Sequence, residues 1–488
     1  MGKRTRDYLA LDLGAESGRA IVGRFDGRRL RLTELYRFTH DSLRFNGTLR
    51  WHVLGMAAHL RLALAAAAAA SRGNLRSLGV DSWGVDYVLL DRNDDLLGYP
   101  WQYRDARTDP ALPAVFRQIP PLELFRLTGI QPLWFNTLFQ LYAEVMQRTG
   151  AIEAARTLLF IPDFLTWTLG GEKACEYTIA STSQMLDARR RNWARGLLRR
   201  LNLPTALLPP LVAPGALSGR IRPEVARETG APRSLRIVAV GRHDTASAVA
   251  AVPAADAGDW AFLSSGTWSL VGTEESRPAL TEQALAGNLT NEGGLGGAYL
   301  LLANIMGLWL VQELRRAWTD RRGRAPDYAE LTAAAAAAPS GGPRVDPDWP
   351  PFGRPDAMPE KIVRYCRKTR QTPPRTPGEF VRCALDSLAA AYRRALDNLE
   401  AVRGRPIHRL HIVGGGSRNE LLNQLAADAT GREVLAGPVE ATAIGNILAQ
   451  LLADREIHSI AEGRAIVQAS FRPKRFLPRP NRPTSSSP

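Results

Sequence analysis

A short polar cluster, with His243, Asp244, Thr245 and Ser247, lies between an apolar run and an alanine-rich run of this 488-residue sequence. The flanking runs predict a strand that ends just before the cluster and a helix that begins within it. One use of such residues is helix capping, in which Thr245 or Ser247 accepts a hydrogen bond from a free backbone N–H group. The other is general-base catalysis, in which the Asp244 carboxylate accepts the proton of a hydroxyl group that attacks a γ-phosphate.

The stretch "DLGAESGR", residues 12–19, has the composition of a phosphate-binding turn. Gly14 and Gly18 bend the chain after an apolar strand, so backbone N–H groups can face phosphate oxygens. Asp12 ends that strand and could hold Mg²⁺ through water, because Mg²⁺ keeps most of its hydration shell. Arg19 could add positive charge. The same residues also suit an ordinary hairpin turn, in which Asp and Gly are common.

Two further turns could contact a nucleotide. The stretch "LSSGTWSLVG", residues 263–272, is a second turn of the same kind, and its Thr267 offers a hydroxyl donor. The stretch "HIVGGGSRNELLNQL", residues 411–425, puts three glycines between a strand and a helix, where a phosphate or a flat ring can approach closely. It is not GxGxxG, since Asn419 stands where the third glycine would fall, and no P-loop occurs. A hairpin turn and a helix entry packed through glycine are the structural alternatives.

Sugar-binding residues are expected in "GVDSWGVDYVLLD", residues 79–91, where Trp83 lies near the carboxylate of Asp86. Aromatic faces and carboxylates suit a sugar, although a surface hairpin with core aromatics has the same composition. Asn304 and Gln312 lie along a predicted passage from strand to helix. They could face a ligand or only the helix surface.

The elements that position these stretches repeat. Both halves open with strand, glycine turn and strand, at residues 8–27 and 260–274, and both continue into helices. The alternation of strands and helices predicts an α/β protein, and the similar openings predict a duplicated unit rather than one doubly wound sheet. This layout is that of two actin-like ATPase (ribonuclease H-like) domains with a catalytic cleft between them. We expect the first, sugar-binding and catalytic domain over 1–247, a nucleotide-binding domain over 248–470 and a disordered tail over 471–488.

Composition limits the class of protein. The formal net charge is +15. Only five of the 63 basic residues are lysines, and the basic residues are spread along the whole chain. We interpret the charge as a preference for arginine with a mild attraction for phosphorylated ligands, because no nucleic-acid-binding motif accompanies it. Three cysteines are too few for a secreted disulfide scaffold. The N-terminus lacks a signal-peptide pattern, and the longest apolar run, Leu62 to Ala70, is shorter than the ~20 residues of a membrane span. We therefore expect a soluble cytoplasmic protein, a monomer or small homo-oligomer, without a membrane or specific nucleic-acid partner.

A series of stretches from residue 10 to about residue 446 resembles the FGGY family of carbohydrate kinases. The most specific are "SWGVD", "HDTASA" and "NIMGLW", and they are joined by "LDLGAESGR", "YRDART", "TNEGG", "HIVGGGSRNELLNQL" and "AGPVEATAIGN", among others. The resemblance implies transfer of the γ-phosphate of ATP to O1 of L-rhamnulose, giving L-rhamnulose 1-phosphate in L-rhamnose catabolism, with Mg²⁺. Closure of the two domains would exclude water, so that the sugar takes the phosphate.

Matched residue by residue, the resemblance implies that Asp244 is the catalytic base. The sugar-binding residues that it implies, besides Asp244, are Gly84, His243, Thr245 and Asn304. The nucleotide-binding residues that it implies are Ala15, Glu16, Ser17, Gly18, Arg19, Thr267, Gln312 and Gly415. Asp12 is the expected metal residue.

Some positions depart from the family pattern. Family members can carry a cysteine pair where Cys366 and Cys383 stand, and a reducing cytoplasm disfavours this link. Some carry a second pair where this chain has Ala426 and Thr430, so that link cannot form here. Arg242 is bulkier than the small residue expected before the His-Asp pair, so its side chain is the one that could disturb the sugar site.

Other functions are open on the sequence. One is kinase activity on another ketose or polyol, such as xylulose or fuculose, and another is ATP-dependent binding by an actin-like fold without sugar chemistry. A basic nucleic-acid binder would show strongly salt-dependent binding. A Ser-His-Asp hydrolase is disfavoured, because the GxSxG elbow is absent and adjacent His and Asp side chains point in different directions.

Overall fold

The computed structural model describes residues 5–40, 42–254, 259–320 and 322–479. The chain divides into two compact units, each assembled from separate stretches of sequence. The first unit contains Met1–Asp256, Glu274–Leu301 and Glu440–Phe471, and the second contains Ala257–Thr273, Leu302–Val439 and Arg472–Pro488.

The first unit is built on a six-stranded sheet with the order β13-β14-β6-β1-β2-β3. Strand β1 pairs antiparallel with β2 and parallel with β6, which confirms the predicted strand, turn and strand at the start of the chain. It is buried from its second residue to its last, as a central strand covered on both faces requires. The strands are β1 (Arg6–Leu13), β2 (Ser17–Phe25), β3 (Leu30–Thr39), β6 (Leu75–Ser82), β13 (Ala216–Arg220) and β14 (Arg236–Ala239).

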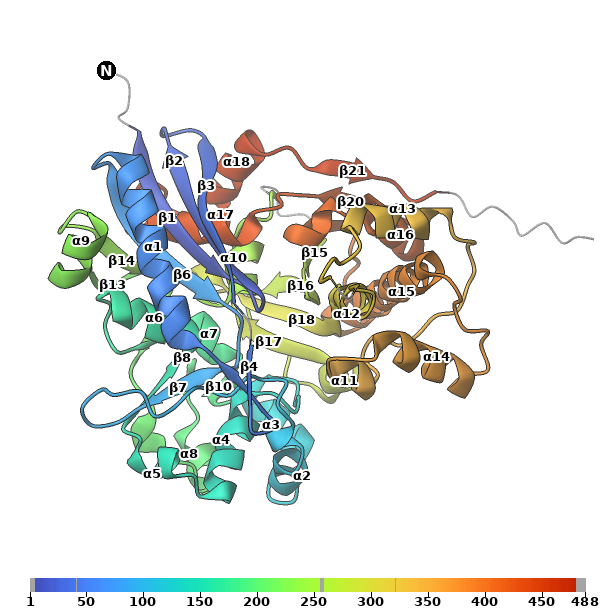
Figure 1. Ribbon diagram of the computed structural model, residues 1–488, viewed down its shortest axis with the longest axis horizontal. Coiled ribbons are helices and arrows are strands. Elements are labelled where there is room, and N and C mark those ends of the chain that lie inside the picture. The colour runs from blue at the N-terminus through green and yellow to red at the C-terminus, as the bar shows by residue number, and fades with distance from the viewer. Residues whose placement is uncertain (1–4, 41, 255–258, 321, 480–488) are drawn as a thin grey trace, which may run out of the picture. The chain divides into compact units, whose positions relative to one another are not determined.

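Helix α1 (Val53–Ser71) packs against β1, β2, β3 and β6, as Figure 1 shows in blue. By length and composition it is long and apolar enough to cross a membrane, which differs from our expectation that no apolar stretch reaches that length. The difference arises because the helix adds further apolar residues, among them Met56 and Leu60, before the run Leu62 to Ala70. One side of α1, with Leu60 and Leu64, is fully buried against the sheet, which is the packing of a core helix.

The rest of the first unit consists mainly of short helices and two-stranded ribbons. Its short strands are β4 (Ser42–Phe45), β5 (Thr48–Trp51), β7 (Tyr87–Leu90), β8 (Thr157–Phe160), β9 (Cys175–Glu176), β10 (Leu186–Asp187), β11 (Asn192–Trp193), β12 (Leu211–Val212) and β17 (Leu289–Gly293). Its further helices are α2 (Ala111–Phe116), α3 (Pro121–Thr128), α4 (Thr137–Gln147), α5 (Gly150–Ala154), α6 (Ile161–Leu169), α7 (Tyr177–Ser181), α8 (Arg195–Arg200), α9 (Pro223–Thr229), α10 (Asp244–Ala250), α11 (Glu282–Ala286), α17 (Ala441–Ala453) and α18 (Ile460–Ser470).

The second unit repeats the opening of the first. Strand β15 pairs antiparallel with β16 and parallel with β19, as β1 does with β2 and β6, which supports the predicted duplication. Six strands of the seven-stranded sheet run in the order β18-β16-β15-β19-β20-β21. They are β15 (Trp260–Ser265), β16 (Trp268–Glu275), β18 (Tyr299–Met306), β19 (Arg409–Val413), β20 (Glu433–Ala436) and β21 (Lys474–Phe476). Its helices are α12 (Trp309–Ala317), α13 (Tyr328–Ala337), α14 (Met358–Lys368), α15 (Pro377–Arg403) and α16 (Glu420–Thr430).

The expected division of the chain differs from the observed one in three places. Residue 247 lies inside α10, so a boundary there would cut a helix. Residues 274–301 and 440–471, which we expected in the nucleotide-binding domain, belong to the first unit. Within the expected tail, β21 pairs antiparallel with β20, whereas residues 480–488 lie outside the described residues.

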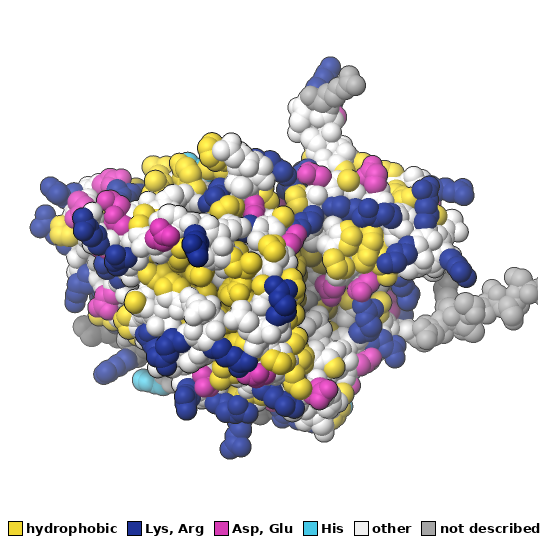
Figure 2. All heavy atoms as spheres, turned by 90° about the horizontal axis from the view of Figure 1, so that it is seen from below, with side chains coloured by type: hydrophobic (Ala, Val, Ile, Leu, Met, Phe, Trp, Pro, Cys, Tyr) yellow, Lys and Arg dark blue, Asp and Glu magenta, His cyan; other side chains and the backbone are white. Residues whose placement is uncertain are grey.

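Surface charge and thiols are distributed as the composition suggests. On the face seen in Figure 2, Lys and Arg side chains are dispersed among acidic, apolar and neutral ones and do not join into a stripe. All three cysteines are free and buried, and Cys366 and Cys383 form no disulfide.

Candidate active site

Helix α10 begins at Asp244, and the turn that leads into it is built differently from the capped helix we considered. His243 is the N-cap residue and makes no side-chain capping hydrogen bond. The Ser247 hydroxyl donates to the backbone oxygen of Gly241 (2.7 Å), and the Thr245 hydroxyl donates to Oδ1 of Asp244 (3.2 Å). The capping prediction for Thr245 or Ser247 is therefore wrong, because both hydroxyls lie inside the helix and donate to other oxygens. We call residues 241–245 the His-Asp turn.

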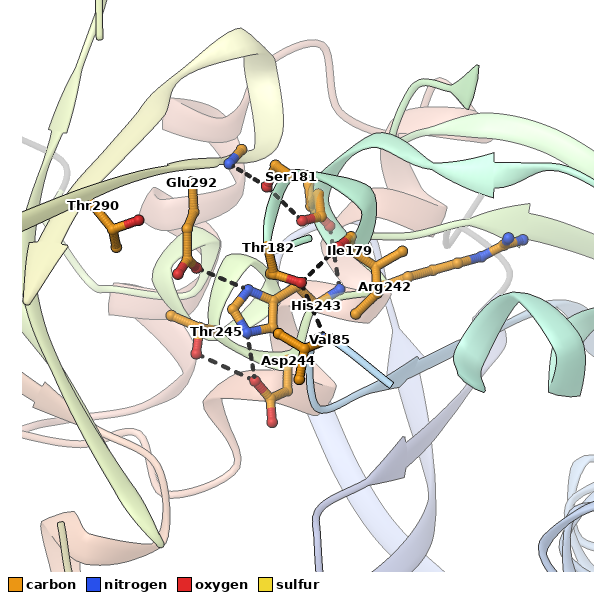
Figure 3. Close-up of polar contacts among 12 residues, drawn as sticks. Val85, Ile179, Ser181, Thr182, Arg242, His243, Asp244, Thr245, Thr290 and Glu292 are labelled. Carbon is orange, nitrogen blue, oxygen red and sulfur yellow. Dashed lines mark hydrogen bonds and ion pairs between the residues drawn. The ribbon is translucent and has the colours of Figure 1, made fainter. Parts of the chain in front are cut away.

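His243 lies between two carboxylates (Figure 3). Its Nδ1 is 3.2 Å from Oε2 of Glu292, and its Nε2 is 3.5 Å from Oδ1 of Asp244. The side chains of His243 and Glu292 are 8% and 6% exposed, whereas that of Asp244 is 32% exposed. Asp244 is thus the member of this row that a substrate can reach.

Burial and the charges in this row shift the pKa values of both His243 and Asp244. Burial alone would lower the pKa of His243, but the carboxylates of Glu292, Asp244 and Glu176 raise it above its ordinary value. Burial raises the pKa of Asp244, the positive charge of His243 lowers it, and the Asp12 carboxylate raises it, with a net upward shift. A carboxylate with a raised pKa is the better proton acceptor, as a general base requires.

Buried polar groups hold the backbone of the His-Asp turn. The backbone N–H of Arg242 donates to Oε2 of Glu176 (3.1 Å), and that of His243 donates to the Thr178 hydroxyl (3.2 Å). The Thr178 hydroxyl in turn donates to Glu176 (2.6 Å). Glu176 is fully buried, and burial raises its pKa to about 7 against the opposing hydrogen bonds. The orientation of the turn therefore depends on a carboxylate at the start of α7.

The Arg242 side chain does not crowd His243 and Asp244. Its side chain points away from His243 and Asp244 in Figure 3 and is fully buried. Its Nη1 donates to Oδ1 of Asp163 (2.6 Å) and its Nη2 to the Ser218 hydroxyl (2.9 Å). The expected risk from its bulk is absent, because this ion pair directs the guanidinium into the interior.

Helix α17 fixes α10 from its other side. A Cβ on Gly445 would lie 1.7 Å from the backbone oxygen of Ser247, so only glycine permits this contact. The neighbouring Asn446 donates to Oδ2 of Asp81 (2.6 Å). These residues lie in the stretch "AGPVEATAIGN", whose place in the first unit the sequence did not reveal.

Asp12 and Asp81 face each other in register on β1 and β6. Arg19 donates to Asp12 (2.6 Å) and is also paired with Glu440. Among the described residues, no group of three or more His, Cys, Asp or Glu side chains could hold a metal, and Oδ1 of Asp81 is buried without a hydrogen-bond partner. The carboxylates of Asp12 and Asp81 offer only oxygen atoms, and one of these atoms has no hydrogen-bond partner. This pair fits Mg²⁺ that is held mainly by water and phosphate.

The first predicted phosphate turn joins β1 to β2. The Gly14 N–H donates to the backbone oxygen of Ser17 (2.9 Å), which closes the turn. Glu16 is exposed, Ala15 and Ser17 are partly exposed, and Gly18 is buried. A Cβ on Gly18 would lie 2.2 Å from the Phe38 ring, so this glycine serves close packing beneath the turn.

The predicted sugar loop rests on a residue that the sequence did not single out. Gly84 lies against Thr182, whose hydroxyl would be 2.9 Å from a Cβ at this position. The next residue, Val85, has a φ of 67° and donates its N–H to the same hydroxyl (3.1 Å). Thr182 therefore fixes the bend of the loop.

Asp86, also in this loop, is not a sugar-binding carboxylate. It is 1% exposed, and it accepts hydrogen bonds from the indoles of Trp51 (2.6 Å) and Trp83 (3.0 Å) and from the Gln140 amide (2.9 Å). Burial raises its pKa to about 6 in spite of these donors. Its lone pairs are used within the protein, so it organises the aromatic residues of the loop.

The second unit carries the other predicted nucleotide residues. Gln312 donates to the Thr267 hydroxyl (3.3 Å), so these two are brought together. Gly415 is exposed, and a Cβ there would meet open space. A Cβ on the adjacent Gly416 would lie 2.0 Å from the Ser265 hydroxyl oxygen. Asn304 is partly exposed on β18. We call residues 414–418 the triple-glycine turn.

Known proteins are similar to this chain over nearly its whole length. A rhamnulokinase of Bacteroides thetaiotaomicron is 41% identical over 474 residues, which are 97% of this chain and 96% of that protein. A rhamnulokinase of Halalkalibacterium halodurans is 39% identical over 469 residues, 96% of this chain and 98% of that protein.

Solved structures show the same fold, and family models match both halves of the chain. The gluconate kinase of Lactobacillus acidophilus matches with a TM-score of 0.78 at 15% identity, over 98% of this chain and 94% of that one. The Plasmodium falciparum glycerol kinase with ADP matches with a TM-score of 0.75 at 15% identity, over 97% and 94%. Residues 8–251 match the N-terminal domain of the FGGY carbohydrate kinases, and residues 261–453 match the C-terminal domain. The chain, with its two actin-like α/β domains, therefore belongs to the FGGY family of carbohydrate kinases.

Proposed function

We propose that this carbohydrate kinase transfers the γ-phosphate of ATP to O1 of L-rhamnulose. The observation that carries the substrate is the 41% identity to a rhamnulokinase over 97% of the chain. The geometry that supports the chemistry is the partly exposed Asp244 carboxylate beside the buried His243.

In the proposed reaction, the 1-hydroxyl of the sugar gives its proton to Asp244 as its oxygen bonds to the γ-phosphorus. The bond between that phosphorus and the β,γ-bridging oxygen breaks, and its electron pair leaves with ADP. Gly84, His243, Thr245 and Asn304 are proposed to bind the sugar.

ATP is proposed to be bound by residues of both phosphate turns and of the triple-glycine turn, namely Ala15, Glu16, Ser17, Gly18, Arg19, Thr267, Gln312 and Gly415. Asp12 would hold Mg²⁺ through water, and the ion would offset the charge of the phosphates. The partial exposure of Ala15 and Ser17 and the exposure of Gly415 support this assignment, because a ligand can reach these residues.

The proposal also covers cellular context. Three free cysteines and the use of ATP fit the reducing cytoplasm. Size-exclusion chromatography with light scattering would separate a monomer from a small homo-oligomer.

An ADP-release assay with purified protein tests the substrate. We expect the highest kcat/KM with L-rhamnulose in a panel that also contains D-xylulose, L-fuculose, glycerol and gluconate, and ³¹P NMR should place the product phosphate on O1. Preference for another ketose would assign the enzyme to that sugar. ATP binding without sugar-stimulated turnover would instead indicate a nucleotide-dependent binding protein.

A further inference from the structure

Glu292 is a buried carboxylate to which the sequence assigned no role. It lies on β17, and its Oε2 is 3.2 Å from Nδ1 of His243, while the opposite ring nitrogen faces Oδ1 of Asp244 at 3.5 Å. Neutral imidazole has an N–H on one nitrogen only, whereas imidazolium has one on each. Because a carboxylate faces each nitrogen, the surroundings favour the imidazolium form of His243.

We propose that Glu292 is a positioning residue of the phosphoryl transfer, which keeps His243 protonated and oriented so that His243 holds the Asp244 carboxylate ionised. The inference rests on the proposed role of Asp244 as the base. Glu292 acts through the ring of His243.

The backbone on both sides of Glu292 is anchored within the first unit. The Gly293 N–H donates to the Ser181 hydroxyl (2.7 Å), and a Cβ on Gly293 would lie 2.6 Å from the Tyr177 ring. On the other side, the Asn291 N–H and its side-chain amide both donate to the backbone oxygen of Gly129 (2.8 and 2.9 Å). Strand β17 therefore presents the Glu292 carboxylate at a fixed place.

The charges around the row agree with this role. His243 faces Glu292 from β17, Asp244 from α10 and Glu176 from the start of α7, and together they raise its pKa although burial opposes them. Asp244 is subject to burial and to the negative charge of Asp12 on β1, both of which favour its protonated form. The cationic ring opposes them most strongly, and the hydrogen bonds from Thr245 act in the same direction.

Losing the positive charge of His243 would leave Asp244 among groups that are mostly negative. Asp244 would then hold its proton and could not accept another.

The ring and Glu292 exchange no proton with substrate in this scheme. The sugar proton moves to Asp244, the new oxygen–phosphorus bond forms, and ADP leaves with the electron pair of the broken bond. The different exposures fit this division, because Asp244 is 32% exposed whereas Glu292 is 6% exposed.

The first test measures the ring directly and needs no turnover. In protein labelled with ¹⁵N-histidine, one of the seven His side chains is assigned to His243 by its loss in His243→Asn. We expect both of its ring nitrogens to be protonated at pH 7.5, and we expect the titration midpoint to fall to lower pH in Glu292→Gln. A neutral His243 ring at pH 7.5 in the wild-type protein overturns the proposal. This result is independent of which sugar is phosphorylated, so it is separate from a failure of the proposed function.

The second test measures catalysis. Glu292→Gln keeps the shape and an acceptor oxygen but removes the charge, and we expect kcat to fall about 10- to 100-fold, less than on loss of a base itself, with KM for ATP unchanged. The control is Glu274→Gln, which removes the same charge from an ion pair with Arg464 (2.8 Å) in the same unit. Circular dichroism confirms that each variant is folded.

A double-mutant cycle separates action through His243 from a general structural effect. If Glu292 acts through the ring, Glu292→Gln has no further effect in the His243→Asn background. Additive losses overturn the proposal, and so does a Glu292→Gln enzyme within twofold of the wild type.

Discussion

The His-Asp turn of the first unit and the triple-glycine turn of the second both follow an apolar strand. The first is held by buried polar side chains, whereas the second consists mainly of glycine backbone. In the His-Asp turn, buried side chains from other elements surround the residues next to Asp244: Glu176 accepts from the Arg242 N–H, and Glu292 lies beside the His243 ring. In the triple-glycine turn, Gly416 packs against Ser265, and Gly415 is exposed. A base needs a tuned side chain, whereas a phosphate or a flat ring needs accessible backbone. The comparison predicts that side-chain changes damage the first turn and added Cβ atoms damage the second.

The largest effect is expected from Asp244→Asn. This change keeps the size of the side chain but removes the proton acceptor, so phosphoryl transfer should fall by about 10²- to 10⁴-fold or more, while ATP binding stays near normal. Sugar-dependent ADP release and calorimetric ATP binding measure the two properties. Asp244→Ala should behave in the same way, and full turnover by either variant would refute the assignment of the base.

The next largest effect is expected from Arg242→Met. It leaves Asp163 buried without its cation, and removing one partner of a buried pair costs about 3–5 kcal/mol. Denaturant unfolding measures this loss. The control is Arg61→Met at the exposed pair with Glu228, which should cost about 1 kcal/mol or less. Equal losses in the two variants would mean that the buried pair does not support the His-Asp turn.

The triple-glycine turn should respond to a single methyl group. In Gly416→Ala the new Cβ meets the Ser265 hydroxyl oxygen at 2.0 Å, so we expect a stability loss of about 1–3 kcal/mol and a raised KM for ATP. Gly415→Ala adds the same methyl group in open space and should leave the free energy of unfolding within about 0.5 kcal/mol. If both variants unfold alike, the close contact with Ser265 is not what shapes the turn.

The smallest effect is expected in the pH profile. The base works when deprotonated, so kcat/KM for the sugar is full above the pKa of Asp244 and is lost as the pH falls through it. Since burial and Asp12 raise this pKa above the ordinary value of about 3.9, the acidic limb should lie above that of an exposed aspartate. A limb at or below the ordinary value would show that His243 outweighs both.

The two turns also differ in how much of them the sequence reveals. Glycines after an apolar strand are a local signal, and the strand, turn and strand at the start of both units were predicted from it. Asp244 was predicted in the same way, by its place between a strand and a helix, and its role as the base stays a prediction. Its supports were missed, because Glu176 and Glu292 lie far from it in sequence and a single buried carboxylate leaves no periodic pattern.

The compact units cut across the predicted domains for a related reason. Two similar openings suggested two continuous halves, but Gly445 and Asn446 contact Ser247 and Asp81 of the first unit. Contacts over such separations depend on tertiary packing, which local propensity does not record. The role of Arg242 was likewise undecidable, because nothing near it in sequence points to Asp163 as its partner.

Strand β21 has a practical consequence for handling the protein. Its residues pair with β20, and Lys474 is bound to Glu420 (2.6 Å). Cutting the chain at residue 470, as a dispensable tail would permit, would remove β21 and make β20, which would then pair with β19 alone, the edge strand with unpaired backbone groups. Such an edge is a template for intermolecular strand pairing, so the shortened protein should precipitate on concentration, and an affinity tag belongs beyond residue 479.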